Sequence, residues 1–264
     1  MKFKNVLLAS DFDGTLTRSD GVIDEKVINA IKYFISEGGN FTVCTGRIHQ
    51  GFHLYNEAYI NAPVIMGNGA MLYDCKNERV VCENSIGDEG VAVFDDILEK
   101  FPEVAVEFYN AEQISAVNAG EVTLKHFEWM KFDYVNVARP NDAKRPWTKV
   151  MIYADKYSQQ VQALLEKHSE VSFLKTTESY IEVLANGVDK GKGLMRLGEM
   201  LGCSPENIYA AGDGYNDVDM LKAAAIGFVP ENGMKEALAV ADRITRSNNN
   251  GCIAHVIEIL DKLY

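Results

Sequence analysis

Short apolar runs that end in acidic or polar clusters constrain the fold of this chain more than any other feature. Residues 6–10 form a short apolar run that ends in Ser10, just before Asp11, and residues 64–66 form another. Continuous runs of this kind, unlike alternating ones, are typical of parallel strands that are buried on both faces. Between them, residues 25–36 carry apolar side chains at helical spacing and end before a glycine pair. The start of the chain therefore predicts repeated β-α-β units of a doubly wound parallel sheet.

This rhythm is interrupted in the middle of the chain and then resumes. β-rich stretches are expected at 105–110, 149–154 and 171–184, with helices near 91–100 and 158–167. The alternation in residues 180–184 indicates an antiparallel strand with one face in water. Afterwards we expect helices at 194–201, 218–224 and 253–263 and strands at 207–211 and 226–229. The predicted fold class is α/β: a Rossmann-like, doubly wound core formed by residues 1–82 and 185–264, with an inserted α+β domain at 83–184.

Charge and cysteine content narrow the possible partners and the compartment. The formal net charge is −12, which repels polyanions and argues against a nucleic-acid or anionic-membrane partner. No apolar run approaches the ~18 residues of a membrane span, and the first residues lack the pattern of a signal peptide. The five cysteines include no C-x-x-C pair, which favours a reducing compartment without structural zinc. We therefore expect a cytoplasmic protein, either a monomer or a small homo-oligomer.

Three polar clusters follow predicted strands of the core. Asp11 and Asp13 follow the first strand, and residues 45–47 follow a second strand that is expected at 41–44. Asp213 and Asp217 follow the strand near residue 209. The carboxyl ends of parallel strands form the ligand crevice of open α/β sheets, so these clusters are expected to meet. Paired carboxylates suit Mg2+, which prefers oxygen ligands. An EF-hand is excluded because neither acidic cluster has glycine at the sixth position of the loop.

Two further segments suit a phosphate group. Thr45 and the Gly46 amide can donate to phosphoryl oxygens, and Arg47 can add a fork of donors. Lys190 lies where the inserted domain gives way to the returning core. The sequence around it is not a P-loop, because Gly193 stands where the Walker pattern needs Ser or Thr. A single ammonium beside several carboxylates is expected to help a phosphate approach them.

These residues resemble, in order and spacing, the four signature motifs of the haloacid dehalogenase superfamily of phosphohydrolases. The matching stretches are Asp11-Phe-Asp-Gly-Thr-Leu16, Thr45-Gly-Arg47, Lys190 and Gly212-Asp-Gly-Tyr-Asn-Asp217. The insertion between the second and third motifs, with Gly67-Asn-Gly-Ala70, is similar to the Cof-type branch with a C2-type cap. One departure is Val229-Pro-Glu-Asn-Gly233, where relatives usually have Ala-Met-x-Asn-Ala; Asn232 is kept.

The resemblance implies a role for each matching residue. Asp11 would be the nucleophile, and Asp13 would protonate the leaving group and then activate water. Mg2+ would be held by the side chains of Asp11 and Asp213 with the backbone carbonyl of Asp13. Thr45 and Lys190 would stabilise the transferring phosphoryl group, and Asp217 would brace Lys190 and the metal ligands, helped by Asn216. The implied substrate-binding residues are Gly46, Arg47, Asn68, Gly69 and Asn216.

The predicted function is a Mg2+-dependent phosphatase that hydrolyses a small phosphorylated metabolite, such as a sugar phosphate, through an aspartyl-phosphate intermediate. A phosphotransferase or phosphomutase is one alternative. A non-catalytic phospho-aspartate receiver is another, and Asp13 and the inserted domain count against it. The inserted domain would select the leaving group, and its candidate contacts are Arg139, Lys144, Arg145, Lys149, Trp129 and His126.

Overall fold

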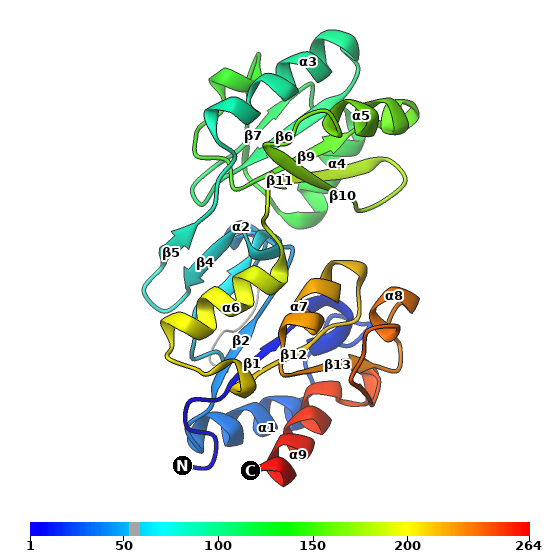
Figure 1. Ribbon diagram of the computed structural model, residues 1–264. Coiled ribbons are helices and arrows are strands. Elements are labelled where there is room, and N and C mark those ends of the chain that lie inside the picture. The colour runs from blue at the N-terminus through cyan, green and yellow to red at the C-terminus, as the bar shows by residue number, and fades with distance from the viewer. Residues whose placement is uncertain (53–58) are drawn as a thin grey trace. The chain divides into compact units, whose positions relative to one another are not determined.

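The computed structural model describes residues 1–52 and 59–264, which divide into two compact units (Figure 1). The first unit comprises Met1–Gly46, Tyr55–Cys82 and Asp189–Tyr264. The second comprises Arg47–Leu54 and Glu83–Val188, so the segment that begins at Arg47 groups with the inserted region and not with the core. Among the described residues, no helix combines the length and the apolar character that crossing a membrane requires.

The first unit is built on a five-stranded parallel sheet. Its strand order is β14-β13-β12-β1-β2, which places β1 between the strands that carry the other two polar clusters. The strands are β1 (Leu7–Ser10), β2 (Asn40–Val43), β12 (Ile208–Ala211), β13 (Ile226–Pro230) and β14 (Arg243–Thr245). Every residue of β1 is buried, as its continuous apolar run predicts. Ser10 pairs with both Ala211 and Val43, so β12, β1 and β2 end level with one another.

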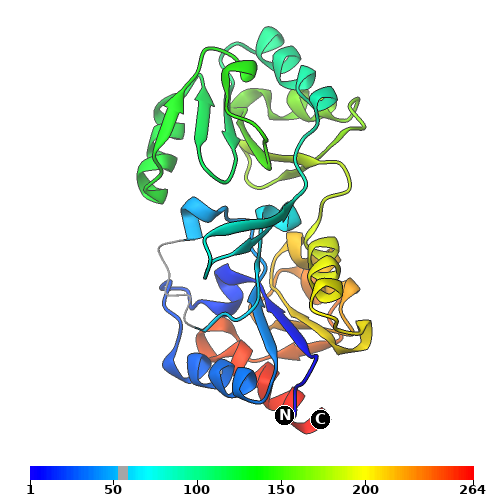
Figure 2. The same cartoon turned by 90° about the vertical axis from the view of Figure 1, so that its left-hand side faces the viewer.

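Helices cover both faces of this sheet, as Figure 2 shows for α1 (Glu25–Ser36) and α6 (Lys190–Met200). On the face of α1 lies α9 (Cys252–Leu263), where the Phe3 ring packs on Phe34 with ring centroids 4.7 Å apart. On the opposite face, α6 and α7 (Val218–Ala223) contribute Leu194, Leu197 and Met220 to a core that includes Leu7 and Ala9 of β1. The doubly wound α/β core is therefore confirmed. A short helix, α8 (Lys235–Leu238), follows β13.

The start of α6 corrects the predicted helix at 194–201. The helix begins at Lys190, because the Asp189 side chain caps it by accepting a hydrogen bond from the Lys192 amide at 2.8 Å. Two glycines in its first turn allow close packing. A methyl carbon at Gly193 would lie 2.8 Å from the Ile65 side chain, and one at Gly191 would lie 2.5 Å from the Asp219 carbonyl oxygen. Lys190 therefore sits on a fixed helix.

A small sheet of order β3-β4-β5 completes the first unit. Its strands are β3 (Val64–Met66), β4 (Met71–Asp74) and β5 (Arg79–Glu83), of which only β3 was expected. A parallel bridge between Cys44 and Ile65 joins β3 to the end of β2. The turn Gly67–Gly69 between β3 and β4 is thereby held beside the carboxyl end of the large sheet.

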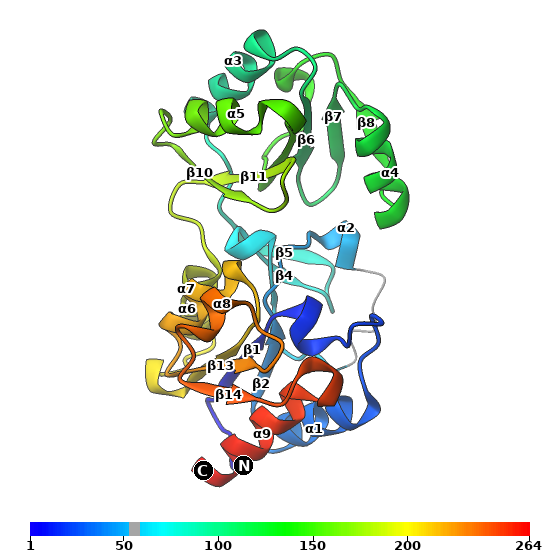
Figure 3. The ribbon, with the colours of Figure 1, turned by 90° about the vertical axis from the view of Figure 1, so that its right-hand side faces the viewer.

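The second unit is an α+β layer with a six-stranded sheet of order β10-β11-β9-β6-β7-β8. The strands are β6 (Ala105–Tyr109), β7 (Ile114–Val117), β8 (Tyr134–Asn136), β9 (Lys149–Tyr153), β10 (Val171–Lys175) and β11 (Tyr180–Ala185). Helices α3 (Ala92–Lys100) and α5 (Ser158–Leu165) lie side by side over one face (Figure 3). That face is packed around Trp147, whose ring centroid lies 4.4 Å from that of Phe108. The unit also contains α2 (His49–Phe52) and α4 (Glu121–Met130), and α4 places Phe127 in a second cluster with Tyr109 and Met151.

The prediction that one face of β11 meets water is wrong. The strand is antiparallel to β9 and β10, but Glu182 is buried. Its carboxylate lies 3.5 Å from the Lys149 ammonium of β9. On β6, which pairs with the other edge of β9, the buried Glu107 accepts a hydrogen bond from the Tyr180 hydroxyl at 3.2 Å. The polar residues of this face pair with one another inside the unit. Alternation in sequence therefore identified the two faces correctly and misjudged which medium one of them meets.

We expect Ile152→Ala in β9 to lower the free energy of unfolding of the second unit by about 2–5 kcal/mol, because the side chain is fully buried in its main core and its loss leaves a cavity. Urea unfolding followed by circular dichroism measures this change. Val135→Ala in β8 of the same sheet is the control, since Val135 is exposed and its truncation is expected to cost less than about 0.5 kcal/mol. Equal losses in both variants would contradict the assignment of this core.

Candidate active site

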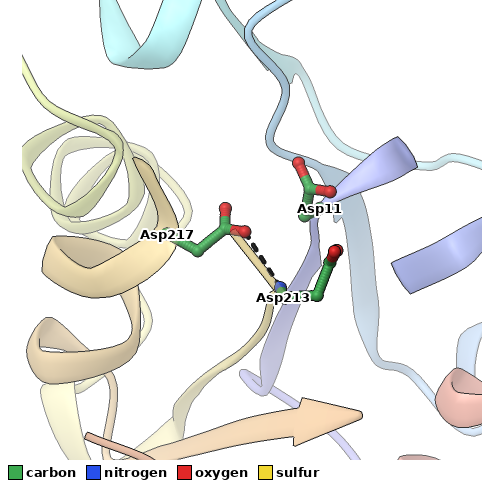
Figure 4. A group of neighbouring side chains, drawn as sticks. All are labelled: Asp11, Asp213 and Asp217. Atoms are coloured by element: carbon green, nitrogen blue, oxygen red, sulfur yellow. Dashed lines mark hydrogen bonds between the residues drawn. The ribbon is translucent and has the colours of Figure 1, made fainter. Parts of the chain in front are cut away.

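The register of the parallel sheet brings the first and last polar clusters together. Asp11 follows β1 directly, and its backbone amide donates to the carbonyl of Ala211 at 2.7 Å. Asp213 stands two residues beyond Ala211 at the end of the adjacent strand β12. Carboxylate oxygens of Asp11, Asp213 and Asp217 all lie within 4.8 Å of one another, and Figure 4 shows the three side chains gathered at this edge. We call Asp11, Asp213, Asp217 and Lys190 the acidic cluster.

Lys190 is the cation at the centre of this cluster. Its Nζ donates to Asp11 Oδ1 and to Asp217 Oδ1, both at 2.6 Å, and its side chain has no exposed surface. The position of the lysine depends on a glycine in the turn after β3. A methyl carbon at Gly69 would lie 2.1 Å from the carbonyl oxygen of Asp189, so only glycine lets the first turn of α6 come this close.

The protonation of the cluster follows from burial and charge. Burial by itself lowers the pKa of Lys190, but the charges of Asp11 and then Asp217 outweigh it, so the net pKa is raised and the ammonium persists. Burial raises the pKa of Asp11 well above its usual range, and the charge of Asp217 adds to this while Lys190 opposes it. Burial also raises the pKa of Asp213. Three carboxylates against one ammonium leave two negative charges in excess when all are ionised.

Hydrogen bonds orient Asp213 and Asp217 differently. Thr15 Oγ1 donates to Asp213 Oδ1 at 2.6 Å. Asp217 Oδ2 accepts from the backbone amides of Asp213 at 3.0 Å, drawn as the dashed line in Figure 4, and of Gly214 at 2.8 Å. Because Asp217 Oδ1 already accepts from Lys190, both of its oxygens are engaged by protein donors. Asp217 is thus suited to positioning its neighbours, and Asp11 and Asp213 are better suited to hold an ion.

The residues expected to contact phosphate gather at the end of β2. The Thr45 amide donates to the Ile65 carbonyl at 2.8 Å, and the Asn68 amide donates to the Thr45 carbonyl at 3.0 Å. Asn216 Nδ2 donates to Asn68 Oδ1 at 2.9 Å, which ties this turn to the loop after β12. A methyl carbon at Gly46 would lie 3.2 Å from the Asn68 side-chain amide. Thr45, Gly46, Asn68 and Asn216 are therefore brought together within the first unit.

Other predicted residues lie elsewhere. Arg47 belongs to the second unit, where its guanidinium donates to the Gly51 carbonyl at 3.3 Å. Asp13 is exposed in the turn after β1, and its carboxylate is not part of the acidic cluster. The basic candidates of the inserted region each face an acidic neighbour within their own unit. These pairs are Arg139–Asp142, Lys144–Glu112, Arg145–Asp88 and Lys149–Glu182.

Gly14 and Thr15 belong to the first sequence motif, which by itself predicts no role for them. Gly14 has φ +86°, and a methyl carbon there would lie 2.6 Å from Asp213 Oδ2. Gly14 thus makes room for Asp213 while Thr15 holds it by a hydrogen bond. The spacing of glycine and threonine behind two aspartates was the available signal. Its meaning depends on Asp213, which lies almost two hundred positions further along the chain.

The donor set of the acidic cluster fits a hard divalent cation. Asp11 and Asp213 offer carboxylate oxygens, which Mg2+ prefers, and a dication would neutralise the two excess negative charges. A parallel sheet with strand-end aspartates around a buried lysine is also the arrangement that the sequence motifs anticipate for a phosphohydrolase.

Comparison with known sequences identifies the family. Residues 8–257 match the profile of the haloacid dehalogenase-like hydrolases, and the chain belongs to this family. Within it, the chain is a Cof-type phosphatase. It is 27% identical over 270 residues to a putative phosphatase, YxeH, of Bacillus subtilis, covering 96% of this chain and 97% of that protein. It is 25% identical over 274 residues to the 5-amino-6-(5-phospho-D-ribitylamino)uracil phosphatase YitU of the same organism, covering 98% of each.

A solved structure shows the same fold over almost the whole chain. BT1666 from Bacteroides thetaiotaomicron, described among phosphatases of the same superfamily, aligns with a TM-score of 0.86 and 21% sequence identity. The alignment covers 98% of this chain and 96% of that one. At this identity the likeness concerns the fold.

We expect Lys190→Met to lower the free energy of unfolding by about 3–5 kcal/mol near neutral pH in a metal-free buffer, because it leaves Asp11 and Asp217 buried without their cation. The pKa of Asp11 is raised in the folded protein, so its ionisation opposes folding as pH rises through that pKa, and the deficit is expected to shrink on acidification. Urea titrations near pH 7.5 and near pH 5 measure it.

Lys192→Met is the matched control on the same helix. Lys192 is exposed and pairs with Asp189, so its replacement is expected to change stability little at either pH. A Lys190→Met deficit that is the same at both pH values would contradict the interpretation that unpaired carboxylates cause it.

Proposed function

We propose that this phosphatase hydrolyses a small phosphomonoester with the help of Mg2+ and through a phosphorylated Asp11. The observation that carries the proposal is the placement of Lys190, which donates to Asp11 and Asp217 at 2.6 Å at the point where Asp213 also converges. A buried ammonium beside a carboxylate at a strand end suits a reaction in which an anionic group approaches that carboxylate. A structural ion pair alone would not require a third carboxylate at the same point.

The chemistry assigns one step to each residue. An Asp11 carboxylate oxygen attacks phosphorus, the bond from phosphorus to the ester oxygen breaks, and Asp13 gives its proton to the departing alkoxide. Water then attacks the aspartyl phosphate, Asp13 takes a proton from it, and inorganic phosphate leaves as the Asp11 carboxylate is restored. Thr45, the Gly46 amide and Lys190 stabilise the charge on the transferring oxygens. Asn68 and Asn216 keep the Thr45 turn in place.

Mg2+ would be held by the carboxylates of Asp11 and Asp213 with the carbonyl of Asp13, and when bound it neutralises negative charge on the phosphoryl group. Thr15 orients Asp213 for this role through its hydrogen bond at 2.6 Å. Asp217 holds Lys190 and the backbone after β12 in place through hydrogen bonds. The protein thus supplies both the ligands and the groups that orient them.

A sugar phosphate or a related polyol phosphate is the proposed substrate class. One relative is named for a substrate that carries its phosphate on a ribityl chain. The net charge of −12 disfavours polyanionic substrates, whereas a single phosphate can be offset locally by Lys190 and a dication. Screening phosphorylated metabolites for phosphate release identifies the member of this class that the enzyme prefers.

We expect Asp11→Asn to lower kcat for p-nitrophenyl phosphate by about a thousandfold or more, because the amide removes the attacking carboxylate oxygen while it preserves the shape of the side chain. Release of p-nitrophenolate at saturating Mg2+ measures this loss. Asp20→Asn is the control, since Asp20 lies on the exposed surface and pairs with Arg18. Wild-type turnover in Asp11→Asn would remove Asp11 from the role of nucleophile.

We also expect apparent Mg2+ affinity to fall as pH decreases, beginning above the usual range of an aspartate. The pKa values of Asp11 and Asp213 are raised, chiefly by burial, so protons compete with the metal for these carboxylates already in weakly acidic solution. Calorimetric Mg2+ titrations of the resting enzyme between about pH 8 and about pH 5, in buffers of different ionisation enthalpy, measure the affinity and the released protons. Affinity independent of pH would contradict metal binding by these two groups.

A further inference from the structure

A loop outside the family motifs touches both halves of the candidate site. The segment after β13, residues 231–234, contains Asn232. Asn232 Nδ2 donates to the carbonyl oxygen of Gly14 at 2.9 Å. Two residues later, the backbone amide of Met234 donates to the carbonyl oxygen of Asp213 at 2.8 Å. One short loop therefore contacts the turn that carries Asp13 and the backbone of the proposed metal ligand.

The loop is itself anchored. Asn232 Oδ1 accepts from the backbone amide of Asn248 at 2.8 Å, and the buried Asn248 side chain donates to the carbonyl of Thr17 at 3.0 Å. The Glu231 amide donates to the Thr245 carbonyl at 3.1 Å. The two asparagines thus connect the turn after β1 to the loops after β13 and β14, through Gly14 in the middle of the turn and Thr17 just after it. We call this chain of hydrogen bonds from Thr17 through Asn248 and Asn232 to Gly14 the asparagine bridge.

Gly14 is the point in the turn where such a restraint has most effect. Its φ of +86° lies outside the helical region, and the turn is kinked at Asp13 and Gly14. A hydrogen bond to the Gly14 carbonyl fixes the peptide plane that follows the kink. Asp13 is the residue before Gly14, one residue away from this plane, and its side chain is exposed. The position of its carboxyl group therefore depends on the backbone being held.

We propose that Asn232 is a positioning residue that holds Asp13 where it can protonate the leaving group. This inference rests on the proposed function, because it requires that Asp13 transfer a proton to the departing oxygen. It adds a residue that lies outside the four motifs and that acts through the backbone of Gly14. Small displacements of a catalytic group can cost about a hundredfold in rate, and general acid catalysis contributes about 10²–10⁴-fold. A neutral amide that donates one hydrogen bond can thus affect turnover strongly.

The test compares two leaving groups. An alkyl phosphate loses a strongly basic alkoxide that needs a proton, whereas p-nitrophenyl phosphate loses a phenolate that leaves without one. Asn232→Asp keeps the shape and the acceptor for Asn248 and removes the donor to Gly14. Asn232→Leu removes the amide without adding charge. We expect both variants to lower kcat/KM by about tenfold or more for the alkyl phosphate and by less than about threefold for p-nitrophenyl phosphate.

The matched control is Asn249→Asp. Asn249 bonds Ser19, with its Oδ1 accepting from the Ser19 amide at 3.0 Å, so it joins neighbouring parts of the same segments outside the bridge. It is expected to keep both kcat/KM values within about twofold of the wild type. Asn232 is exposed, so its variants are expected to fold, and their thermal unfolding temperatures check this.

Two results would overturn the proposal: equal losses on both substrates in the Asn232 variants, or no loss on either. Failure of the proposed function is a different result, because it would appear as full activity in Asp11→Asn. The ratio of the two kcat/KM values in the Asn232 variants is therefore informative only about the bridge.

Discussion

The buried ammonium of Lys190 is the interaction on which the rest of the first unit depends. Its two hydrogen bonds of 2.6 Å, to Asp11 and Asp217, join the ends of β1 and β12 through the first residue of α6. Burying a cation and two carboxylates is costly unless each charge is compensated, so the backbone must place all three within a narrow tolerance. Asp189 and Gly69 meet this requirement. The Asp189 cap fixes where α6 begins, and the lack of a side chain at Gly69 lets the first turn of α6 approach the turn after β3 closely.

The negative charges at this point are only partly compensated by Lys190. With Asp213 included, carboxylates outnumber ammonium groups three to one, and burial holds the pKa values of Asp11 and Asp213 above their usual range. A group of this kind is more stable when a proton or a cation joins it. The same excess of charge that opposes folding therefore favours the binding of a cation. Stability and ligand binding are linked through one cluster, as is common where pKa values are strongly perturbed.

Much of this arrangement follows from the sequence, because parallel strands leave a readable pattern. The fully buried β1 reads as a continuous apolar run, and the polar clusters mark where β1, β2 and β12 end. What the sequence left out depends on contacts between distant residues. In the sequence, Glu182 has the pattern of a solvent-facing residue, and only the fold places Lys149 beside it. The predicted start of the helix at 194 is late because the packing of Ile65 and Asp219 against the preceding glycines leaves no local signal. The position of Arg47 in the second unit likewise has no local signal.

Asn232 shows how a loop outside the four motifs can act on the candidate site. Pro230 and Gly233 flank it and form a turn in which the Gly233 amide donates to the Pro230 carbonyl at 2.8 Å. That turn presents the Asn232 amide toward Gly14 and the Met234 amide toward Asp213. Both contacts end on backbone carbonyls, so they constrain the path of the chain and not the identity of a side chain. A loop outside the acidic cluster can thereby influence the backbone that carries Asp13, the proposed proton donor.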